Sequence, residues 1–143
     1  MSIPRIVVDT SVLIAGLRSQ FGASNRVLTL VAERRLVPLL TTALFLEYED
    51  ALNRPEQRLA TGMSKEDAIG FLAALASAAE PVDVHFMWRP QLADPADELV
   101  LEAAVNGRAS AIVTHNLRDF LSAANTFAIE VITPGAMLER MRK

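Results

Sequence analysis

The sequence predicts an α/β protein whose central parallel sheet is covered by helices on both faces. Two runs, Ile6–Val8 and Ala111–Thr114, lack polar alternation, which is typical of strands buried on both sides. Helix-like segments separate the strand candidates, and this order favours right-handed crossovers between parallel strands. With 143 residues, of which 51% are hydrophobic and 22% charged, we expect one domain over residues 1–143.

The elements of the first half follow from apolar spacing and from the residues that begin each helix. Ser24 is expected to cap one helix, and Thr42 to open another that has an apolar stripe on one face. Ser64 and Asp67 resemble a capping box, with Asp in place of the usual Glu or Gln. After Ile6–Val8 we expect a short helix or turn over 10–17, a helix from 24 to 34–35, a strand over 36–41, a helix from 42 to 53–55, a helix over 68–78 and an edge strand over 82–86.

The second half repeats this alternation. Asp94 and Pro95 are expected to begin a helix that stops at 106–107, because Pro suits the first helical position and Gly suits the C-terminal stop. After the strand over 111–114 we expect a loop over 115–119, a short helix over 120–124, a strand over 129–133 and a last helix from Pro134 to 143.

Composition excludes several classes of function. The chain has 14 basic and 17 acidic residues, a net charge of −3, so charge alone does not predict a nucleic-acid-gripping surface. If several acids are gathered in a metal site, the charge of the remaining surface is closer to neutral. Cysteine is absent, which excludes disulfides and thiolate metal sites and favours a cytoplasmic protein. No apolar run reaches membrane-spanning length, and Asp9 interrupts any signal-peptide core, so we expect no membrane association.

Three acids lie where a parallel sheet places its chemistry. Asp9 ends the first strand, Asp119 lies five residues past Thr114, and Asp97 begins the helix that leads to this second buried strand. Parallel topology brings at least Asp9 and Asp119 to one edge of the sheet. Each acid could instead cap a helix, and taken singly each segment favours capping, with Asp94 and Pro95 completing the cap beside Asp97.

Asp97 is the most informative acid because helical spacing puts it on the apolar face of its helix, where an unsatisfied carboxylate is costly. In the helix from Thr42, Glu47 and Glu49 flank the apolar stripe on opposite sides, and spacing cannot choose between them. The two histidines, His85 and His115, are interpreted as ordinary surface or loop residues.

Several carboxylates at one point repel one another, and one takes up a proton unless a cation is present. A ligand set made only of oxygens favours Mg²⁺ or Mn²⁺. Such an ion can activate water for attack on a phosphodiester. The acids, if they meet, therefore predict metal-assisted phosphodiester hydrolysis.

Four segments together resemble one family, the PIN-domain ribonucleases, and within it the bacterial toxins of toxin–antitoxin pairs, similar to the VapC toxins. The resemblance covers nearly the whole chain and rests on the order and distances of the four motifs. They are the segments 6–13 (Ile-Val-Val-Asp-Thr-Ser-Val-Leu), 46–52 (Leu-Glu-Tyr-Glu-Asp-Ala-Leu), 94–104 (Asp-Pro-Ala-Asp-Glu-Leu-Val-Leu-Glu-Ala-Ala) and 112–120 (Ile-Val-Thr-His-Asn-Leu-Arg-Asp-Phe).

The resemblance implies a three-layer α/β/α sandwich, an RNA substrate, a cognate antitoxin protein and, in many members, a homodimer. It implies metal-binding and catalytic roles for Asp9, Glu47, Asp97 and Asp119, and so selects Glu47 over Glu49. Supporting roles fall to Asp94, Asn116 and Ser11. Many relatives have an acid at the position of Asn116, which leaves the last ligand open between Asn116 and Asp119, and the family's usual Asn is replaced by Ser11.

The leading hypothesis is therefore a divalent-metal-dependent endoribonuclease in which Arg18, Arg54 or Arg118 holds the RNA backbone. The Ser11 and Asn116 departures motivate an alternative, an inactive PIN-fold binding module that acts through protein or RNA contacts. A third interpretation, an aspartyl phosphatase or phospho-receiver, lacks its motifs: the phosphatase needs an acid at the position of Ser11, and the receiver needs an upstream acidic pair and a late Lys.

Overall fold

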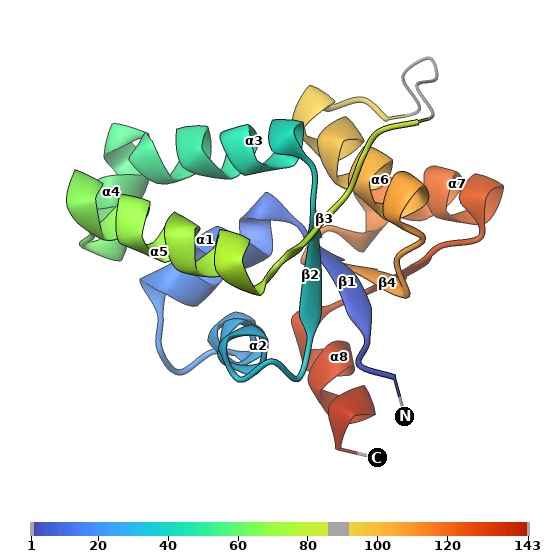
Figure 1. The fold of residues 1–143 in the computed structure, drawn as a ribbon, viewed down its shortest axis with the longest axis horizontal. Coiled ribbons are helices and arrows are strands. Elements are labelled where there is room, and N and C mark those ends of the chain that lie inside the picture. The colour runs from blue at the N-terminus through green and yellow to red at the C-terminus, as the bar shows by residue number, and fades with distance from the viewer. Residues whose placement is uncertain (1, 86–91, 143) are drawn as a thin grey trace.

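The computed structural model describes residues 2–85 and 92–142 and has a five-stranded, all-parallel sheet at its centre (Figure 1). The strand order is β3-β2-β1-β4-β5. The strands are β1 (Arg5–Val8), β2 (Val37–Leu40), β3 (Glu80–Pro81), β4 (Ala111–Val113) and β5 (Glu130–Ile132). The helices are α1 (Thr10–Arg18), α2 (Ala23–Ala32), α3 (Thr42–Asn53), α4 (Pro55–Thr61), α5 (Lys65–Ala78), α6 (Pro95–Gly107), α7 (Leu117–Phe127) and α8 (Pro134–Met141).

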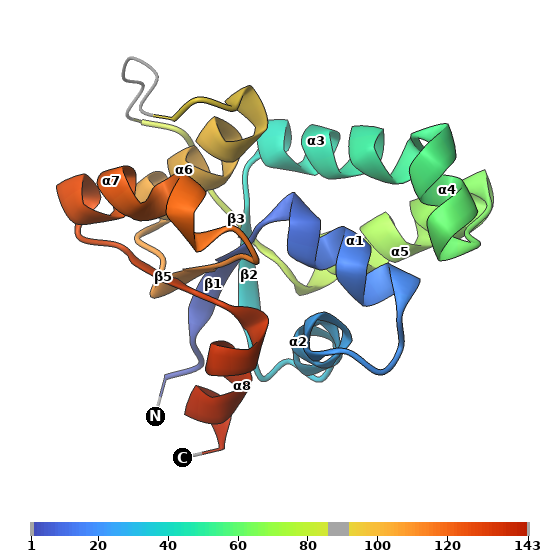
Figure 2. The ribbon, with the colours of Figure 1, turned by 180° about the vertical axis from the view of Figure 1, so that it is seen from behind.

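Helices cover both faces of the sheet and produce a three-layer α/β/α arrangement, as predicted. In Figure 1 the strands lie between α6 and α7 on the right and α1, α3, α4 and α5 on the left, and Figure 2 shows the same two groups from behind with the sides exchanged. Helix α6 contacts β1, β2 and β4. The central strands β1 and β4 are apolar because both of their faces are buried, and Ile6, Val7, Ala111, Ile112 and Val113 are all 0% exposed.

The order of the strands creates a switch point between β1 and β4. From β1 the chain moves outward to β2 and β3, and it later returns to place β4 on the other side of β1. Val8 lies in register with Val113, and the Asp9 N–H donates to the Val113 carbonyl at 2.9 Å. Ligands of open α/β sheets bind beyond the strand C-termini at such a point. Asp9 and Thr114, which directly follow these two strands, lie at this switch point.

Two helices differ from the prediction. Helix α4 was not predicted: α3 ends at Asn53 as expected, but Pro55 then begins a new helix, which Gly62 terminates in the left-handed region at φ 73°. The prediction of a loop over 115–119 is wrong from Leu117 onward, because α7 begins there. The Asp119 N–H closes its first turn on the Asn116 carbonyl at 3.0 Å.

The predicted cap at Ser24 is also wrong, since Gly22 is the N-cap of α2 and Ser24 lies inside the helix. The Ser24 hydroxyl instead lies 2.7 Å from His115 Nε2. The capping box of Ser64 and Asp67 is confirmed, with both reciprocal hydrogen bonds at 3.0 Å.

The predicted edge strand over 82–86 lies too far along the chain. The observed strand β3 is Glu80–Pro81, paired with Leu39 and Leu40. The Val82 N–H makes the last sheet-like bond, to the Leu40 carbonyl at 2.9 Å, because β2 ends there and leaves no partner for residues beyond. Residue 86 of the predicted strand lies outside the described residues. In the part of the chain that the structure describes, no helix is long and apolar enough to cross a membrane.

Candidate active site

Asp9 lies at the C-terminal end of β1 and is only 4% exposed. Its backbone carbonyl accepts hydrogen bonds from the N–H groups of Val12 at 2.9 Å and Leu13 at 3.2 Å. Its side chain makes no capping bond to α1. The side-chain cap that competed with the ligand interpretation is therefore not formed, and the carboxylate is available for other contacts.

Two hydroxyl groups hold this carboxylate. Asp9 Oδ2 accepts a hydrogen bond from Ser11 Oγ at 2.7 Å and another from Thr114 Oγ1 at 2.6 Å. The same Thr114 oxygen accepts the N–H of Asn116 at 2.9 Å, which orients the hydroxyl proton toward Asp9. Both hydrogen bonds to the carboxylate within the described residues end on Oδ2, so Oδ1 is the oxygen that can face a cation. Ser11, to which the family resemblance gives a supporting role, is in direct contact with Asp9.

Tyr48 lies behind the end of β1 and is 2% exposed. Its hydroxyl donates to the Val8 carbonyl, one residue before the acid. Burial, and then the negative charge of Asp9, raise the pKa of Tyr48 far above its ordinary value, so the phenol stays protonated and remains a donor. Neither Tyr48 nor Thr114 was among the predicted site residues.

Asp94 and Asp97 begin α6 with different roles. Asp94 is the N-cap, confirming that part of the sequence prediction, and its Oδ1 accepts the Ala96 N–H at 2.9 Å. Asp97 lies in the first turn and is partly buried. Its pKa is raised from 3.8 to about 6, first by burial and then by neighbouring negative charges. In decreasing order of effect, those charges belong to Asp9, Asp94, Asp119 and Glu98.

Asp119 is exposed in the first turn of α7, two residues inside the helix rather than at its cap. Asn116 is the N-cap of α7, but its side chain makes no capping bond. The two candidates for the last ligand therefore lie one helical turn apart. Of the two, only Asp119 is an acid, and its charge contributes to the raised pKa of Asp97 after burial, Asp9 and Asp94. Arg118 is exposed beside them.

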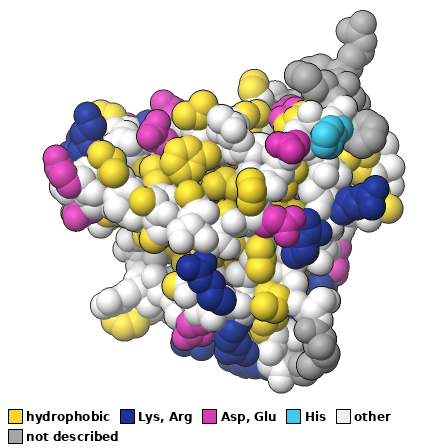
Figure 3. All heavy atoms as spheres, viewed as in Figure 1, with side chains coloured by type: hydrophobic (Ala, Val, Ile, Leu, Met, Phe, Trp, Pro, Cys, Tyr) yellow, Lys and Arg dark blue, Asp and Glu magenta, His cyan; other side chains and the backbone are white. Residues whose placement is uncertain are grey.

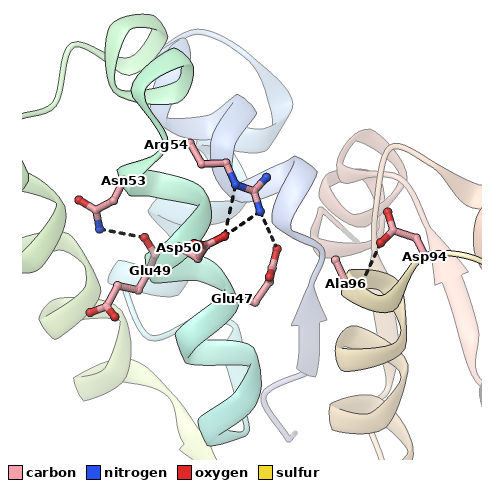
Figure 4. A network of polar contacts seen from close by, with 7 residues as sticks. All are labelled: Glu47, Glu49, Asp50, Asn53, Arg54, Asp94 and Ala96. Atoms are coloured by element: carbon pink, nitrogen blue, oxygen red, sulfur yellow. Dashed lines mark hydrogen bonds and ion pairs between the residues drawn. The ribbon is translucent and has the colours of Figure 1, made fainter.

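Glu47 extends from α3 toward Arg54, while Asp94 projects from the start of α6 on the other side of β1 (Figure 4). The side chain of Glu47 is 16% exposed, against 68% for that of Asp50. Burial raises the pKa of Glu47 above its ordinary value; Arg54 opposes this shift, while Asp50 and Asp94 add to it. Glu49 is exposed. Of the two acids that spacing could not separate, Glu47 is the less exposed one, and Asp94 contributes to its raised pKa.

Arg54 connects the acids of α3. Its Nη2 lies 3.5 Å from Glu47 Oε1 and donates to Asp50 Oδ2 at 2.9 Å. Arg18, in the last turn of α1, is exposed and forms no ion pair within the described residues. Both histidines are exposed, as predicted: His115 contacts Ser24, and the His85 backbone N–H donates to Asn106 Oδ1 at 2.8 Å.

The donor set fits a hard divalent cation in its chemistry. The acids supply only carboxylate oxygens. Burial first, and neighbouring acids after it, raise the pKa of Asp97 and, despite Arg54, that of Glu47, so their charged forms are disfavoured in the metal-free protein. Across residues 2–85 and 92–142, no three acidic or histidine side chains form a ready-made metal cage. Mg²⁺ does not need one, because it is commonly held by one or two carboxylates together with water and substrate phosphates.

A parallel α/β sheet with carboxylates gathered at its switch point defines a class of proteins suited to metal-assisted chemistry on phosphate esters. Residues 5–118 match the family model described as PIN domain, and the chain belongs to this family. PIN domains are generally nucleases that use divalent metal ions, so membership of this family supports a nuclease of the hydrolase class. The match ends one residue before Asp119. No curated protein matched the chain.

Proposed function

We propose that the protein is a divalent-metal-dependent endoribonuclease. The observation that carries the proposal lies at the switch point, where burial, and after it the charges of Asp9, Asp94 and Asp119, raise the pKa of Asp97 to about 6. Holding unpaired acids together is unfavourable in the absence of a cation. Binding of a divalent cation would relieve this repulsion and so stabilise the folded protein.

In this proposal Asp9, Glu47, Asp97 and Asp119 are the catalytic and metal-binding residues. Ser11 and Thr114 orient Asp9 through their hydrogen bonds, and Asp94 orients the first turn of α6 as its cap. A bound Mg²⁺ or Mn²⁺ would activate a water molecule and stabilise the charge that develops on the phosphodiester. The side chains of Arg18, Arg54 and Arg118 would hold the RNA backbone.

We further propose that the ribonuclease is a cytoplasmic toxin inhibited by a cognate antitoxin, in line with the VapC-like sequence motifs. On the face shown in Figure 3, hydrophobic side chains gather over α3 and α5, while Lys and Arg are dispersed among acids. Here an apolar cavity of about 320 Å³ is lined by Leu40, Phe45, Ala76 and Ala79, among others. Apolar patches of this kind support a protein partner, whether an antitoxin or a second copy of the chain.

The decisive experiment compares the wild type with Asp9→Asn, which keeps one oxygen to accept the hydrogen bonds of Ser11 and Thr114 but removes the charge of residue 9. We expect the wild type to cleave RNA with Mg²⁺ or Mn²⁺ and to stop when EDTA is added. The variant should be folded by circular dichroism but inactive. Undiminished cleavage by Asp9→Asn would refute the assignment of the site.

A thermal unfolding titration separates the nuclease from the inactive binding module. Because a ligand that binds only the folded state stabilises it, millimolar Mn²⁺ should raise the melting temperature of the wild type and not that of Asp9→Asn. The absence of any shift in the wild type would favour the binding module. Induced expression in bacteria, with growth arrest expected for the wild type alone, tests the toxin role.

A further inference from the structure

One guanidinium, that of Arg54, is shared between two acids of α3 (Figure 4). Glu47 and Asp50 are three residues apart, so they lie on the same face of this helix. Arg54 Nη2 donates to Asp50 Oδ2 at 2.9 Å and lies 3.5 Å from Glu47 Oε1, while Arg54 Nε donates to the same Asp50 oxygen at 3.3 Å. Arg54 therefore joins a proposed metal ligand to an acid outside the proposed catalytic set.

The backbone at this corner does not depend on the Arg54 side chain. Arg54 precedes Pro55, which restricts it to an extended conformation, and it has φ −63° and ψ 135°. It is the N-cap of α4, yet its side chain makes no capping bond there. The contacts of the guanidinium are thus with the two carboxylates, and its removal leaves the cap of α4 unchanged.

The two carboxylates that share Arg54 differ in their surroundings. Asp50 is largely exposed, so water and salt screen its attraction to the guanidinium, whereas the less exposed Glu47 is screened less. Among the described residues, Arg54 is the one cation within ion-pair distance of Glu47. A cation that binds Glu47 would therefore lie close to a positive charge already held there, and the two would repel each other.

We propose that Arg54 is an internal counter-cation that competes with the divalent metal ion for Glu47, and that Asp50 retains the guanidinium when Glu47 binds the ion. Arg54 neutralises Glu47 in the metal-free protein, and its nearer partner, Asp50, is outside the metal site. The competition raises the metal concentration at which the site fills. Once released from Glu47, Arg54 is available for the RNA contact proposed above. The inference rests on the proposed nuclease function and adds to it a control of metal loading.

The affinity for Mn²⁺ tests this competition without a cleavage assay, because the electron paramagnetic resonance signal of free Mn²⁺ reports how much of the ion is bound. We expect Arg54→Gln to bind Mn²⁺ about fivefold more tightly than the wild type, the effect of one partly exposed ion pair. Arg58→Gln is the matched control. It removes the same charge from an exposed position four residues further along the chain, which forms no ion pair with any described residue, and it should bind Mn²⁺ like the wild type.

A second variant, Asp50→Asn, should change the affinity in the opposite direction, because it leaves the guanidinium to Glu47 alone. Its matched control is Glu49→Gln, which removes the same charge from the neighbouring exposed position of α3. We expect Asp50→Asn to bind Mn²⁺ more weakly than Glu49→Gln does. Equal affinities in these two variants would overturn the role of Asp50.

The competition itself is overturned if Arg54→Gln binds Mn²⁺ no more tightly than Arg58→Gln, or if none of the proteins binds the ion. Weaker binding by Arg54→Gln would mean that Arg54 instead positions Glu47 for the metal. These results are separable from the nuclease assay. Tighter Mn²⁺ binding by Arg54→Gln in a protein that never cleaves RNA would refute the nuclease and keep the competition, whereas RNA cleavage with equal Mn²⁺ affinities would do the reverse.

Discussion

Replacing Asp97 by Asn should change how the stability of the protein depends on pH. The pKa of Asp97 is about 6 in the folded protein, against an ordinary value of 3.8, because burial and nearby acids disfavour its charged form. Between these two pH values the folded state holds the proton more tightly than the unfolded state. The contribution of Asp97 to the free energy of unfolding is therefore fully present below pH 3.8. It falls as the pH rises from 3.8 to about 6, and it is lowest above pH 6.

The size of the effect follows from the two pKa values. Each pH unit between them corresponds to about 1.4 kcal/mol, which places an upper limit of about 3 kcal/mol on the loss. Asp97 is only partly buried, and solvent screening reduces this to roughly 1–2 kcal/mol. Asn is neutral throughout, so Asp97→Asn should be more stable than the wild type by that amount at pH 7.5 and about equal to it at pH 3.5.

Urea unfolding without metal, repeated between pH 3.5 and 7.5, measures this difference. Other carboxylates also titrate, including Asp67, Glu80 and Glu130, whose hydrogen bonds to Ser64, Arg5 and Arg140 lower their pKa values. They are common to both proteins and cancel in the comparison. Asp83→Asn, at an exposed position after β3, is the matched control and should follow the wild type. A pH-independent difference between Asp97→Asn and the wild type would refute the electrostatic argument.

Three further predictions concern the residues around Asp9 and the RNA. Tyr48→Phe leaves the buried Val8 carbonyl without its donor and should lower the free energy of unfolding by about 1–3 kcal/mol in urea; no loss would mean that the carbonyl is satisfied by water. Thr114→Val should cost a similar amount and reduce RNA cleavage, whereas Thr114→Ser keeps the hydroxyl and should retain most of both; equal loss in the two variants would argue for packing instead. Arg118→Ala should weaken RNA binding and reduce the slope of log K against log salt by about one, measured by fluorescence anisotropy, and an unchanged slope would exclude a phosphate contact.

Much of the fold could be predicted because its two central strands, β1 and β4, are buried on both faces. Ile6–Val8 and Ala111–Val113 have no polar alternation, and this reports burial directly. Helix α4 could not be found this way, since none of its residues is buried and it shows no apolar stripe. The position of β3 depends on where its partner β2 ends, which is a property of the pairing and not of residues 80–85 themselves.

The candidate site was predicted in part for a similar reason. Acids that follow strands stand out, and the topology alone places Asp9 near β4. Thr114 gave no such signal, because Thr is an ordinary strand residue and its value lies in a hydrogen bond to a residue 105 positions away. Spacing likewise could not select Glu47, whereas the three-dimensional structure shows its interaction with Asp94. Long-range contacts of this kind become visible only once the strands are arranged.

The separation of backbone and side chain at Asp9 has an evolutionary consequence. The carbonyl of this residue begins α1, and its side chain contributes no bond to the helix. Asn can accept the hydroxyl groups of Ser11 and Thr114 in its place, and a single base change converts an Asp codon into an Asn codon. Given the catalytic role proposed for Asp9, an inactive descendant that keeps the fold and its binding surfaces is one mutation away. Catalytic and non-catalytic members of such a lineage can then arise from each other without passing through an unfolded intermediate.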